Sequence, residues 1–379
     1  MHILVAHHVP NKRDSGMSRL MGFIHDRLAA DGDRIDYFCE ENVPAHRYVG
    51  IHRLSFPLLL LRHAALAARA GDKYDVINVH EPSAAAITVL KRAAGSPAVV
   101  VTSHGLERRG WELALEEGRL GRASPGLRTR LTHPLITLWQ ADLALKQADH
   151  IFCLNGQDRE FLATRFRIPR KRVTRIYPGA DELYAEVAGC RNYFKPVERL
   201  LFAGTWRKNK GIEDLVPAFT MLAAQYPTLR LTIFGAGVPA TPILQAFHES
   251  LRPRIDYVTA SDESETAQVF ASADIYLLPS LFEGTPLTLI EAMMSGLPIV
   301  TTETCGMKDV IQSRSNGMLV QIREPRAIAD AVSDLIIDAD LRARLGRAAR
   351  ADAMRRYTWA AAAAPVRQIY QDLLKYRHG

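Results

Sequence analysis

Short apolar runs alternate along the whole chain with longer segments in which apolar residues recur every three or four positions. The short runs are rich in Val, Ile and Leu, which is typical of parallel strands buried on both faces, whereas the longer segments are typical of amphipathic helices. A first series of strands is predicted at 3–6, 35–38, 76–79, 99–102, 151–154 and 173–177. A second series is predicted at 200–203, 231–234, 255–258, 275–278, 299–301 and 318–320.

Strands that alternate with helices predict an α/β fold, and two separate series predict two doubly wound, Rossmann-like domains. Periodicity is lost near 181–196, so we place an N-terminal domain at 1–185 and a C-terminal domain at 186–359. Residues 360–379 form one more amphipathic helix. Because ligands of open parallel sheets bind beyond the carboxyl ends of the strands, motifs that directly follow strands carry the functional information.

The distribution of charge divides the chain in the same way. Lys and Arg outnumber Asp and Glu by 48 to 41, and the whole excess lies in residues 1–195, with 28 against 21. Such asymmetry indicates an anionic partner for the first half, namely a nucleotide, a membrane surface or nucleic acid. An ordinary solvated surface explains the charge equally well.

Several classes of protein are excluded or disfavoured. The four cysteines form no CxxC pair and no zinc-type cluster with histidine, so we interpret them as reduced thiols. No apolar run approaches the roughly 18 residues of a membrane span. The opening MHILVAHH is typical of a buried strand rather than a signal peptide, and we expect a cytoplasmic protein.

The segment LLPSLFEGTPLTLIEAMMSGLPIVTT, residues 277–302, contains the most informative chemistry. A strand should end at Pro279, and Thr285 and Pro286 should open a helix as N-cap and first-turn proline. The free N–H groups of Thr285, Leu287 and the residue after it, together with the helix dipole, would then suit a phosphate. The segment therefore predicts an anion site at the start of this helix.

Two carboxylates flank this predicted anion site. Glu283 lies in the loop before it and Glu291 lies about a turn and a half into the helix. Carboxylates are poor phosphate ligands, but they are good acceptors for sugar hydroxyls. The spacing of eight residues alone would be coincidence, whereas its surroundings, EG-x-P-L-x-x-I-E-A-M-x-x-G-x-P, favour a binding site for a phosphorylated sugar.

This segment resembles the E-x7-E motif of the retaining, GT-B-fold glycosyltransferases of family 4, and the similarity extends over nearly the whole chain. The resemblance implies two Rossmann-like domains that face each other across a cleft, with the last helix crossing back to the first domain. It implies that Glu291 binds the ribose and Glu283 the donor sugar, while the backbone of Thr285, Pro286 and Leu287 holds the sugar or diphosphate.

The segment LLFAGTWRKNKGIEDLVPAF, residues 200–219, resembles the part of the family that binds the diphosphate through an Arg and a Lys. Lys210 and Gly211 fit that pattern. The family's arginine normally follows the first glycine directly, and Thr205 occupies that place here. Arg207 or Lys208 would have to supply the missing charge, and a basic surface turn is the alternative interpretation.

Two first-domain segments also resemble the family. In VVVTSHGLE, His104 ends a strand and is a candidate catalytic residue near the anomeric carbon, although a lone histidine is more often structural. In NKRDSGMSR, only Gly16 matches the glycine-rich loop under the donor phosphates. Two D-x-D strings, at 31–33 and 338–340, fall at predicted helix ends, so we assign them structural roles. We expect no metal and no cofactor beyond the donor itself.

The leading hypothesis is a metal-independent, retaining hexosyltransferase that uses a UDP- or GDP-sugar. Its acceptor would be a hydroxyl of a glycan or lipid-linked molecule in bacterial surface polysaccharide or glycoconjugate synthesis. A nucleotide-sugar epimerase or hydrolase on the same fold is one alternative, and a non-catalytic basic protein that binds membrane or nucleic acid is another. No nucleic-acid module is recognised.

A membrane surface is a better-supported partner than nucleic acid. His52, Arg53, Arg62 and Arg69 surround the apolar positions 56 and 58–61, and further cations follow at 119–130. Such a basic amphipathic surface would bind anionic lipid on the inner face of the membrane, although a helix packed on the sheet is equally consistent. The nucleobase, sugar, acceptor and oligomeric state do not follow from the sequence.

Overall fold

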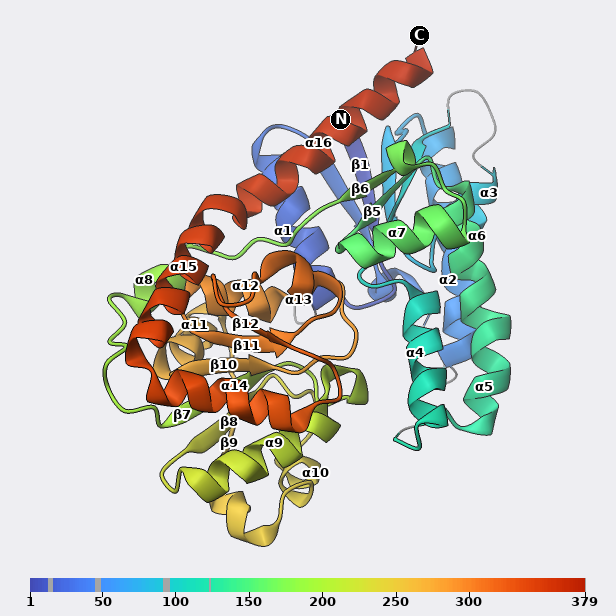
Figure 1. Ribbon diagram of the computed structural model, residues 1–379. Helices are drawn as coiled ribbons and strands as arrows, with labels where there is room; N and C mark the ends of the chain where they lie inside the picture. Colours follow the sequence, from blue (N-terminus) through green and yellow to red (C-terminus); the bar gives the residue numbers. More distant parts are fainter. Residues whose placement is uncertain (13–15, 45–48, 91–95, 123, 379) are drawn as a thin grey trace. The chain divides into compact units, whose positions relative to one another are not determined.

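The computed structural model describes residues 1–12, 16–44, 49–90, 96–122 and 124–378. They form two compact units (Figure 1), of which unit 1 comprises Met1–Tyr177 and Trp359–Gly379 and unit 2 comprises Pro178–Thr358. Within the described residues each unit contains one six-stranded parallel sheet, and every predicted strand is present. The predicted α/β fold with two doubly wound domains is confirmed.

The sheet of unit 1 has the strand order β2-β1-β3-β4-β5-β6. Its strands are β1 (His2–Ala6), β2 (Arg34–Phe38), β3 (Val76–His80), β4 (Ala98–Thr102), β5 (His150–Cys153) and β6 (Val173–Arg175). Its helices are α1 (Gly16–Ala30), α2 (Val49–Arg69), α3 (Ala85–Leu90), α4 (Glu107–Arg119), α5 (Leu127–His133), α6 (Trp139–Gln147), α7 (Gly156–Arg165) and α16 (Trp359–His378). Short turns are η1 (Glu40–Asn42), the π-helical η2 (Pro134–Leu138) and η3 (Arg170–Arg172).

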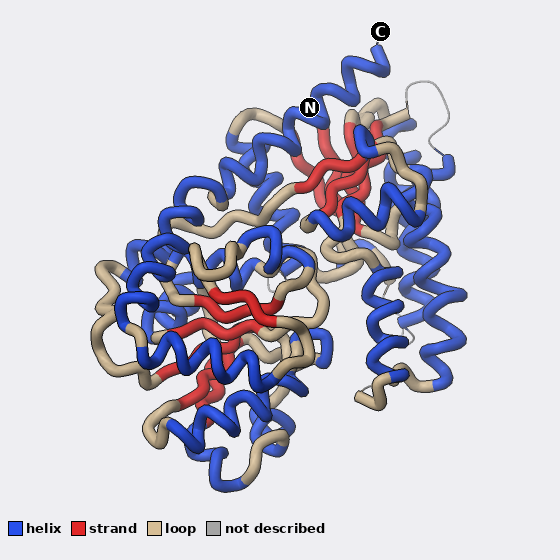
Figure 2. Tube along the Cα trace, viewed as in Figure 1, coloured by secondary structure: helices blue, strands red, loops and turns tan. Residues whose placement is uncertain are grey.

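Both faces of the unit 1 sheet are buried, because alternate strand residues point to opposite sides. Ile3 and Val5 pack with α1 and α16 on one face, and Leu4 and Ala6 pack with α2, α6 and α7 on the other. Figure 2 shows this sheet enclosed by helices. The predicted last helix, α16, belongs to unit 1, as the resemblance implied.

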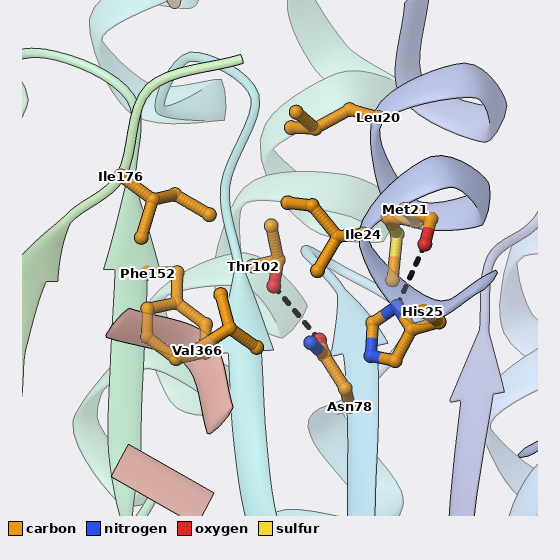
Figure 3. A pocket seen from close by; sticks show the side chains of 9 residues that line it. All are labelled: Leu20, Met21, Ile24, His25, Asn78, Thr102, Phe152, Ile176 and Val366. Atoms are coloured by element: carbon orange, nitrogen blue, oxygen red, sulfur yellow. Dashed lines mark hydrogen bonds between the residues drawn. The ribbon is translucent and has the colours of Figure 1, made fainter. Parts of the chain in front are cut away.

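A buried chain of hydrogen bonds attaches α1 and α16 to this sheet. Thr102 donates to Asn78, Asn78 donates to the Tyr370 hydroxyl (2.6 Å), and this hydroxyl lies 2.9 Å from His25 Nε2. Burial lowers the pKa of His25 to about 4, so the imidazole is neutral and its Nε2 can accept a hydrogen bond from the Tyr370 hydroxyl. A small cavity among these groups (Figure 3) is lined mainly by apolar side chains, and it belongs to the core.

The sheet of unit 2 has the strand order β12-β11-β10-β7-β8-β9. Its strands are β7 (Arg199–Ala203), β8 (Arg230–Phe234), β9 (Ile255–Val258), β10 (Ile275–Leu278), β11 (Ile299–Thr302) and β12 (Met318–Val320). Its helices are α8 (Leu183–Ala188), α9 (Ile212–Gln225), α10 (Ala240–Gln245), α11 (Glu263–Ser272), α12 (Leu287–Met294), α13 (Cys305–Val310), α14 (Pro325–Ile337) and α15 (Ala339–Arg356), with short turns η4 (Lys208–Lys210) and η5 (Glu249–Arg254). Helix α9 packs on α14, whereas α8, α11, α12 and α15 pack together as a second group.

The structure divides the chain between Tyr177 and Pro178, before the predicted boundary between 185 and 186. The segment that follows Pro178 is held within unit 2, because the Ala180 N–H donates to the Tyr357 carbonyl (2.9 Å). The Tyr184 hydroxyl then donates to Glu263 on α11 (2.7 Å). The predicted boundary therefore falls inside α8 (Leu183–Ala188), a helix of unit 2.

Candidate functional site

The sheet order of unit 2 creates a topological switch point between β7 and β10. Strand β7 leads to β8 on one side, whereas β10 leads to β11 on the other, so from these two neighbouring strands the chain continues in opposite directions along the sheet. Crevices of this kind are the usual ligand sites of open α/β sheets. The residues at this edge are 204–211 after β7 and 279–286 after β10, and they include most of the predicted donor-site residues.

Gly211 brings these two loops into direct contact. Its φ of 71° lies in the left-handed region, and a Cβ at this position would stand 1.8 Å from the Pro279 carbonyl oxygen. The loops are also joined by the Leu281 N–H, which donates to the Asn209 carbonyl (2.8 Å). Only glycine fits at position 211 without moving one loop away from the other.

The close approach of the loops places Lys210 against Glu283. The Lys210 ammonium forms an ion pair with Glu283 Oε1, and the Ser280 hydroxyl donates to the same oxygen (3.1 Å). Only 17% of the Lys210 side chain and 12% of the Glu283 side chain are exposed. The predicted phosphate-binding cation and the predicted sugar-binding carboxylate therefore lie together in a partly desolvated site, where charges interact more strongly than in water.

The start of the next helix differs from the prediction by one residue. Pro286 has an extended ψ of 131° and is the N-cap, and α12 begins at Leu287. Thr285 is not the N-cap, because the loop turns one residue later than a Thr-Pro pair suggests. The N–H groups of Leu287 and Thr288 lie in the first turn of α12, which keeps the anion-binding geometry there.

Thr285 is held by α13 instead. It is 5% exposed, and a Cβ on Gly306 would stand 2.2 Å from the Thr285 hydroxyl oxygen. The Gly306 N–H also donates to the Gly284 carbonyl (2.8 Å). The start of α13 thus fixes the backbone of the loop that precedes α12.

Glu291 lies on α12 and is 1% exposed. Burial raises the pKa of Tyr276, and the charges of Glu291 and Glu283 raise it further, while the hydrogen bond from the Tyr276 hydroxyl to Thr288 opposes the increase. Both carboxylates therefore act electrostatically on one tyrosine. The predicted pair of glutamates is brought to the same part of unit 2.

The two candidate cations beside Lys210 have different surroundings. Lys208 is paired with Glu213 (2.9 Å). Arg207 is exposed, and its side chain forms no ion pair or hydrogen bond within the described parts of the chain. Thr205 stands where the family has an arginine, and Arg207 and Lys208 were the two predicted replacements. Of these two, Arg207 is the one whose charge is not already paired within the described residues.

His104 lies in unit 1, directly after β4. Burial, with His7 and His8 nearby, lowers its pKa to about 3, and its Nε2 finds no hydrogen-bond partner among the described residues. The imidazole is thus neutral at physiological pH. A neutral imidazole can form a hydrogen bond with a sugar hydroxyl, but it cannot supply a positive charge.

His104 is one of four histidines at the carboxyl edge of unit 1. His7 and His8 follow β1, His80 ends β3, and the rings of His8 and His104 lie 5.2 and 5.1 Å from that of His80. The other three histidines were not predicted as candidates from the sequence. Their position at the ends of strongly apolar strands, as in MHILVAHH and DVINVH, was a signal that could have found them.

Glu81 was also missed. It is 1% exposed, and neither carboxylate oxygen makes a hydrogen bond of ordinary geometry with the described residues. Burial raises its pKa well above the usual range, the charge of Glu107 adds to this, and nearby Ser103 offsets only part of it. The carboxyl group next to this histidine group is therefore protonated more readily than an ordinary glutamate.

The predicted contact of Gly16 with donor phosphates is not tested, since residues 13–15 of its loop lie outside the described residues. Gly16 itself is exposed at the first position of α1. The two D-x-D strings have structural partners. Asp33 contacts the N-terminal ammonium and Arg367, and Asp338 caps α15 through the Leu341 N–H.

One set of described side chains has the spacing of a metal site. His2, Asp36 and Asp72 bring their ligand atoms within 4.8 Å of one another. Arg34 already pairs with Asp72 (2.8 Å), and His2 lies 2.9 Å from Asp36. These ion pairs explain why the three side chains lie close together. The group lies at the start of β1, at the edge of the unit 1 sheet opposite to that of His104.

Comparison with known proteins agrees with this geometry. Residues 192–352 match the family model of glycosyl transferases group 1, and residues 15–182 match that of glycosyltransferase family 4. The chain belongs to the GT-B glycosyltransferases of family 4. It is an enzyme, a glycosyltransferase that acts on a nucleotide-sugar donor.

Alignments with similar proteins span most of the length of this glycosyltransferase. A D-inositol 3-phosphate glycosyltransferase of Corynebacterium jeikeium is 27% identical over 88% of this chain and 81% of its own. A phosphatidyl-myo-inositol mannosyltransferase of Mycolicibacterium smegmatis is 25% identical over 87% and 79%. The structure resembles a sucrose-phosphate synthase from Thermosynechococcus elongatus, with a TM-score of 0.77 and 20% identity over 99% of both chains.

Proposed function

We propose that the protein transfers a hexose, with retention at the anomeric carbon and without a metal, from a UDP- or GDP-sugar to an acceptor hydroxyl. The observation that carries this proposal is the pairing of Lys210 and Glu283 beside the first turn of α12, at the switch point of unit 2. A cation and free N–H groups suit a diphosphate, and carboxylates suit sugar hydroxyls.

In the proposed reaction, Lys210, Arg207 and the N–H groups of Leu287 and Thr288 stabilise the leaving diphosphate electrostatically. Glu283 accepts hydrogen bonds from the donor sugar, and Glu291 accepts them from the ribose. The bond between the anomeric carbon and the phosphate oxygen breaks as the acceptor oxygen attacks from the same face. The departing phosphate takes the acceptor proton, so no protein carboxylate has to act as nucleophile.

His104 has a narrower role in this proposal. Its depressed pKa makes it a neutral partner for a hydroxyl of the donor sugar near the anomeric carbon. Gly16 is proposed to bring backbone under the donor phosphates. Both roles belong to the substrate-bound enzyme.

The proposed acceptor is a glycan or a lipid-linked molecule in bacterial surface polysaccharide or glycoconjugate synthesis. The excess of positive charge in the first half of the chain supports an anionic acceptor or an acceptor on an anionic surface. One relative is named for transfer to a phosphatidyl-myo-inositol, which supports a lipid-linked acceptor. The protein would then act on the cytoplasmic side, bound peripherally to the inner face of the membrane.

A thermal-shift screen against UDP, GDP, ADP and dTDP identifies the donor, because a bound nucleotide stabilises the folded state. With that donor, NMR of the product shows whether the anomeric configuration of the donor sugar is kept, and EDTA should leave the rate unchanged. An inverted product would exclude the retaining mechanism. Turnover that needs no acceptor would instead indicate the epimerase or hydrolase.

A further inference from the structure

Helix α5, the π-helical η2 and helix α6 form one helical run from Leu127 to Gln147. This run carries four large apolar side chains at intervals of four residues. Leu127, Leu131, Leu135 and Trp139 are 75, 61, 73 and 48% exposed. We call these four residues the exposed stripe. Single exposed apolar residues are common on proteins, but a row of four on one run is not.

The π-helical turn helps to keep these side chains in line. In a regular α-helix a spacing of four residues exceeds one turn by about 40°, so a long row drifts around the helix. The π-helical segment Pro134–Leu138 has more residues per turn than an α-helix, which offsets part of that drift. Leu135 and Trp139 therefore stay near the side of the run that carries Leu127 and Leu131.

Along the chain, the segment that carries the exposed stripe has charge of one sign. The sequence contains no Asp or Glu from Gly118 to Ala141, but it contains four arginines there. Arg122 pairs with Glu117, whereas Arg119 and Arg128 are exposed and form no ion pair with described residues. An apolar stripe with unpaired cations beside it is the pattern of a surface that binds anionic lipid.

Helix α2 adds to this surface only in part. Arg53 donates to the Thr137 hydroxyl (2.9 Å) and thereby holds α2 beside η2, and Leu58 of α2 is 63% exposed. Phe56 and Leu60 are fully buried in the core, and Leu59 and Leu61 pack against it. The predicted apolar surface at positions 56 and 58–61 was therefore wrong except for Leu58. The side chain of His52 lies outside the described residues.

We infer that the exposed stripe docks on a bilayer that contains anionic phospholipid. A tryptophan beside leucines suits the headgroup boundary, and arginines suit lipid phosphates. A second copy of this chain is a poorer partner, because a two-fold contact would place the arginines of one copy against those of the other. No helix within the described residues is long and apolar enough to cross a membrane. The inference deepens the proposed function and rests on it for the membrane location.

The test measures cosedimentation of the full chain with sucrose-loaded vesicles of phosphatidylcholine, with or without about one third phosphatidylglycerol. We expect the wild type to bind the anionic vesicles at least tenfold better, and 0.5 M NaCl to weaken this binding. Leu127→Ser/Leu131→Ser/Leu135→Ser should lose at least tenfold. Ile337→Ser/Met354→Ser is the matched control, because these unit 2 side chains are 77 and 50% exposed, and it should bind like the wild type.

A second variant, Arg119→Glu/Arg128→Glu, keeps the inference testable if the leucine variant does not fold, and it should also lose anionic binding. Wild-type binding by both leucine and arginine variants would overturn the inference. So would equal binding of the wild type to neutral vesicles, or a wild-type dimer that the leucine variant converts to monomer in sedimentation. Transfer to a water-soluble acceptor is assayed separately, so a wild type that binds vesicles but transfers no sugar would refute the proposed function alone.

Discussion

Lys210 and Glu283 are the side chains on which the proposed reaction depends most. They come from different loops, and both are largely shielded from water. We predict that Lys210→Ala and Glu283→Ala each lower turnover at least about a hundredfold, as expected when one preorganised electrostatic contact is removed. The measurement is the transfer rate of the purified variants with the donor found by the thermal-shift screen. Near-normal rates would refute the site assignment.

The ion pair also makes a prediction that separates binding from catalysis. Glu283 and a diphosphate compete for the charge of Lys210, so Glu283→Gln should release Lys210 to the nucleotide. We expect the free nucleoside diphosphate to bind several-fold more tightly while the transfer rate falls, because Gln cannot replace the carboxylate toward sugar hydroxyls. Calorimetric titration gives the affinity. Weaker nucleotide binding by Glu283→Gln would show that Lys210 does not serve the diphosphate.

The choice between Arg207 and Lys208 can be tested in the same way. Lys208 is paired with Glu213, whereas Arg207 has no described partner. We therefore expect Arg207→Ala to weaken nucleotide binding about tenfold and Lys208→Ala to change it less than about twofold, since exposed ion pairs contribute little. The two variants serve as each other's control in one titration series. The opposite order would identify Lys208 as the replacement for the missing arginine.

At this scale the sequence predicts residue types better than contacts. The spacing from Glu283 to Glu291 was visible in the sequence, but their common effect on Tyr276 depends on a tertiary contact, in which α12 folds back so that Thr288 meets the Tyr276 hydroxyl on β10. The group of His8, His80 and His104 was missed for the same reason. Each of these residues follows a different strand, and only the sheet order β1-β3-β4 brings them together.

Among the elements, the strands were predictable because each is a continuous apolar run, whereas the helix starts were not. The segment before α12 contains Thr-Pro, which is a usual start signal, yet α13 holds Thr285 outside the helix. The π-helical η2 leaves no recognisable local signal either. Tertiary contacts therefore decide the details that local sequence leaves open.

The contact between η4 and the end of β10 gives a prediction at the element scale. Gly211→Ala would place a Cβ 1.8 Å from the Pro279 carbonyl oxygen, so the loop after β7 must move and carry Lys210 away from Glu283. We expect nucleotide affinity to fall at least tenfold and the melting temperature to fall by several degrees, as for about 1–3 kcal/mol of strain.

Gly189→Ala is the matched control for this variant. Gly189 also has a positive φ, of 53°, but a Cβ there would meet nothing closer than 3.9 Å. Its ψ of −138° differs from the 27° of Gly211, so the Gly189→Ala variant shows the cost of a positive φ in general, without the clash. It should keep normal nucleotide affinity. If Gly211→Ala binds nucleotide as well as Gly189→Ala does, the loop contact is not needed for the site.

For the whole molecule, the uneven distribution of positive charge in the sequence is matched by an uneven distribution of histidines. Unit 2 contains one histidine, the exposed His248. All the described histidines with a lowered pKa lie in unit 1, and burial is the largest cause in each case. They are His7, His25, His80, His104, His133 and His150. Because these groups are protonated in the unfolded chain before the folded one, acid should destabilise unit 1 in particular.

We predict that the free energy of unfolding of unit 1 falls by at least about 2 kcal/mol between pH 7 and pH 5. An unfolded histidine takes up its proton near pH 6.5, and each one that stays neutral in the folded state costs up to about 1.4 kcal/mol per pH unit below that. Glu81, Glu107 and Asp158, whose pKa burial raises, oppose this trend but are outnumbered. Urea unfolding of Trp206→Phe, followed by tryptophan fluorescence, reports on unit 1 alone, because the other three tryptophans lie there. A free energy that stays constant from pH 7 to pH 5 would show that these histidines are not neutral in the folded protein.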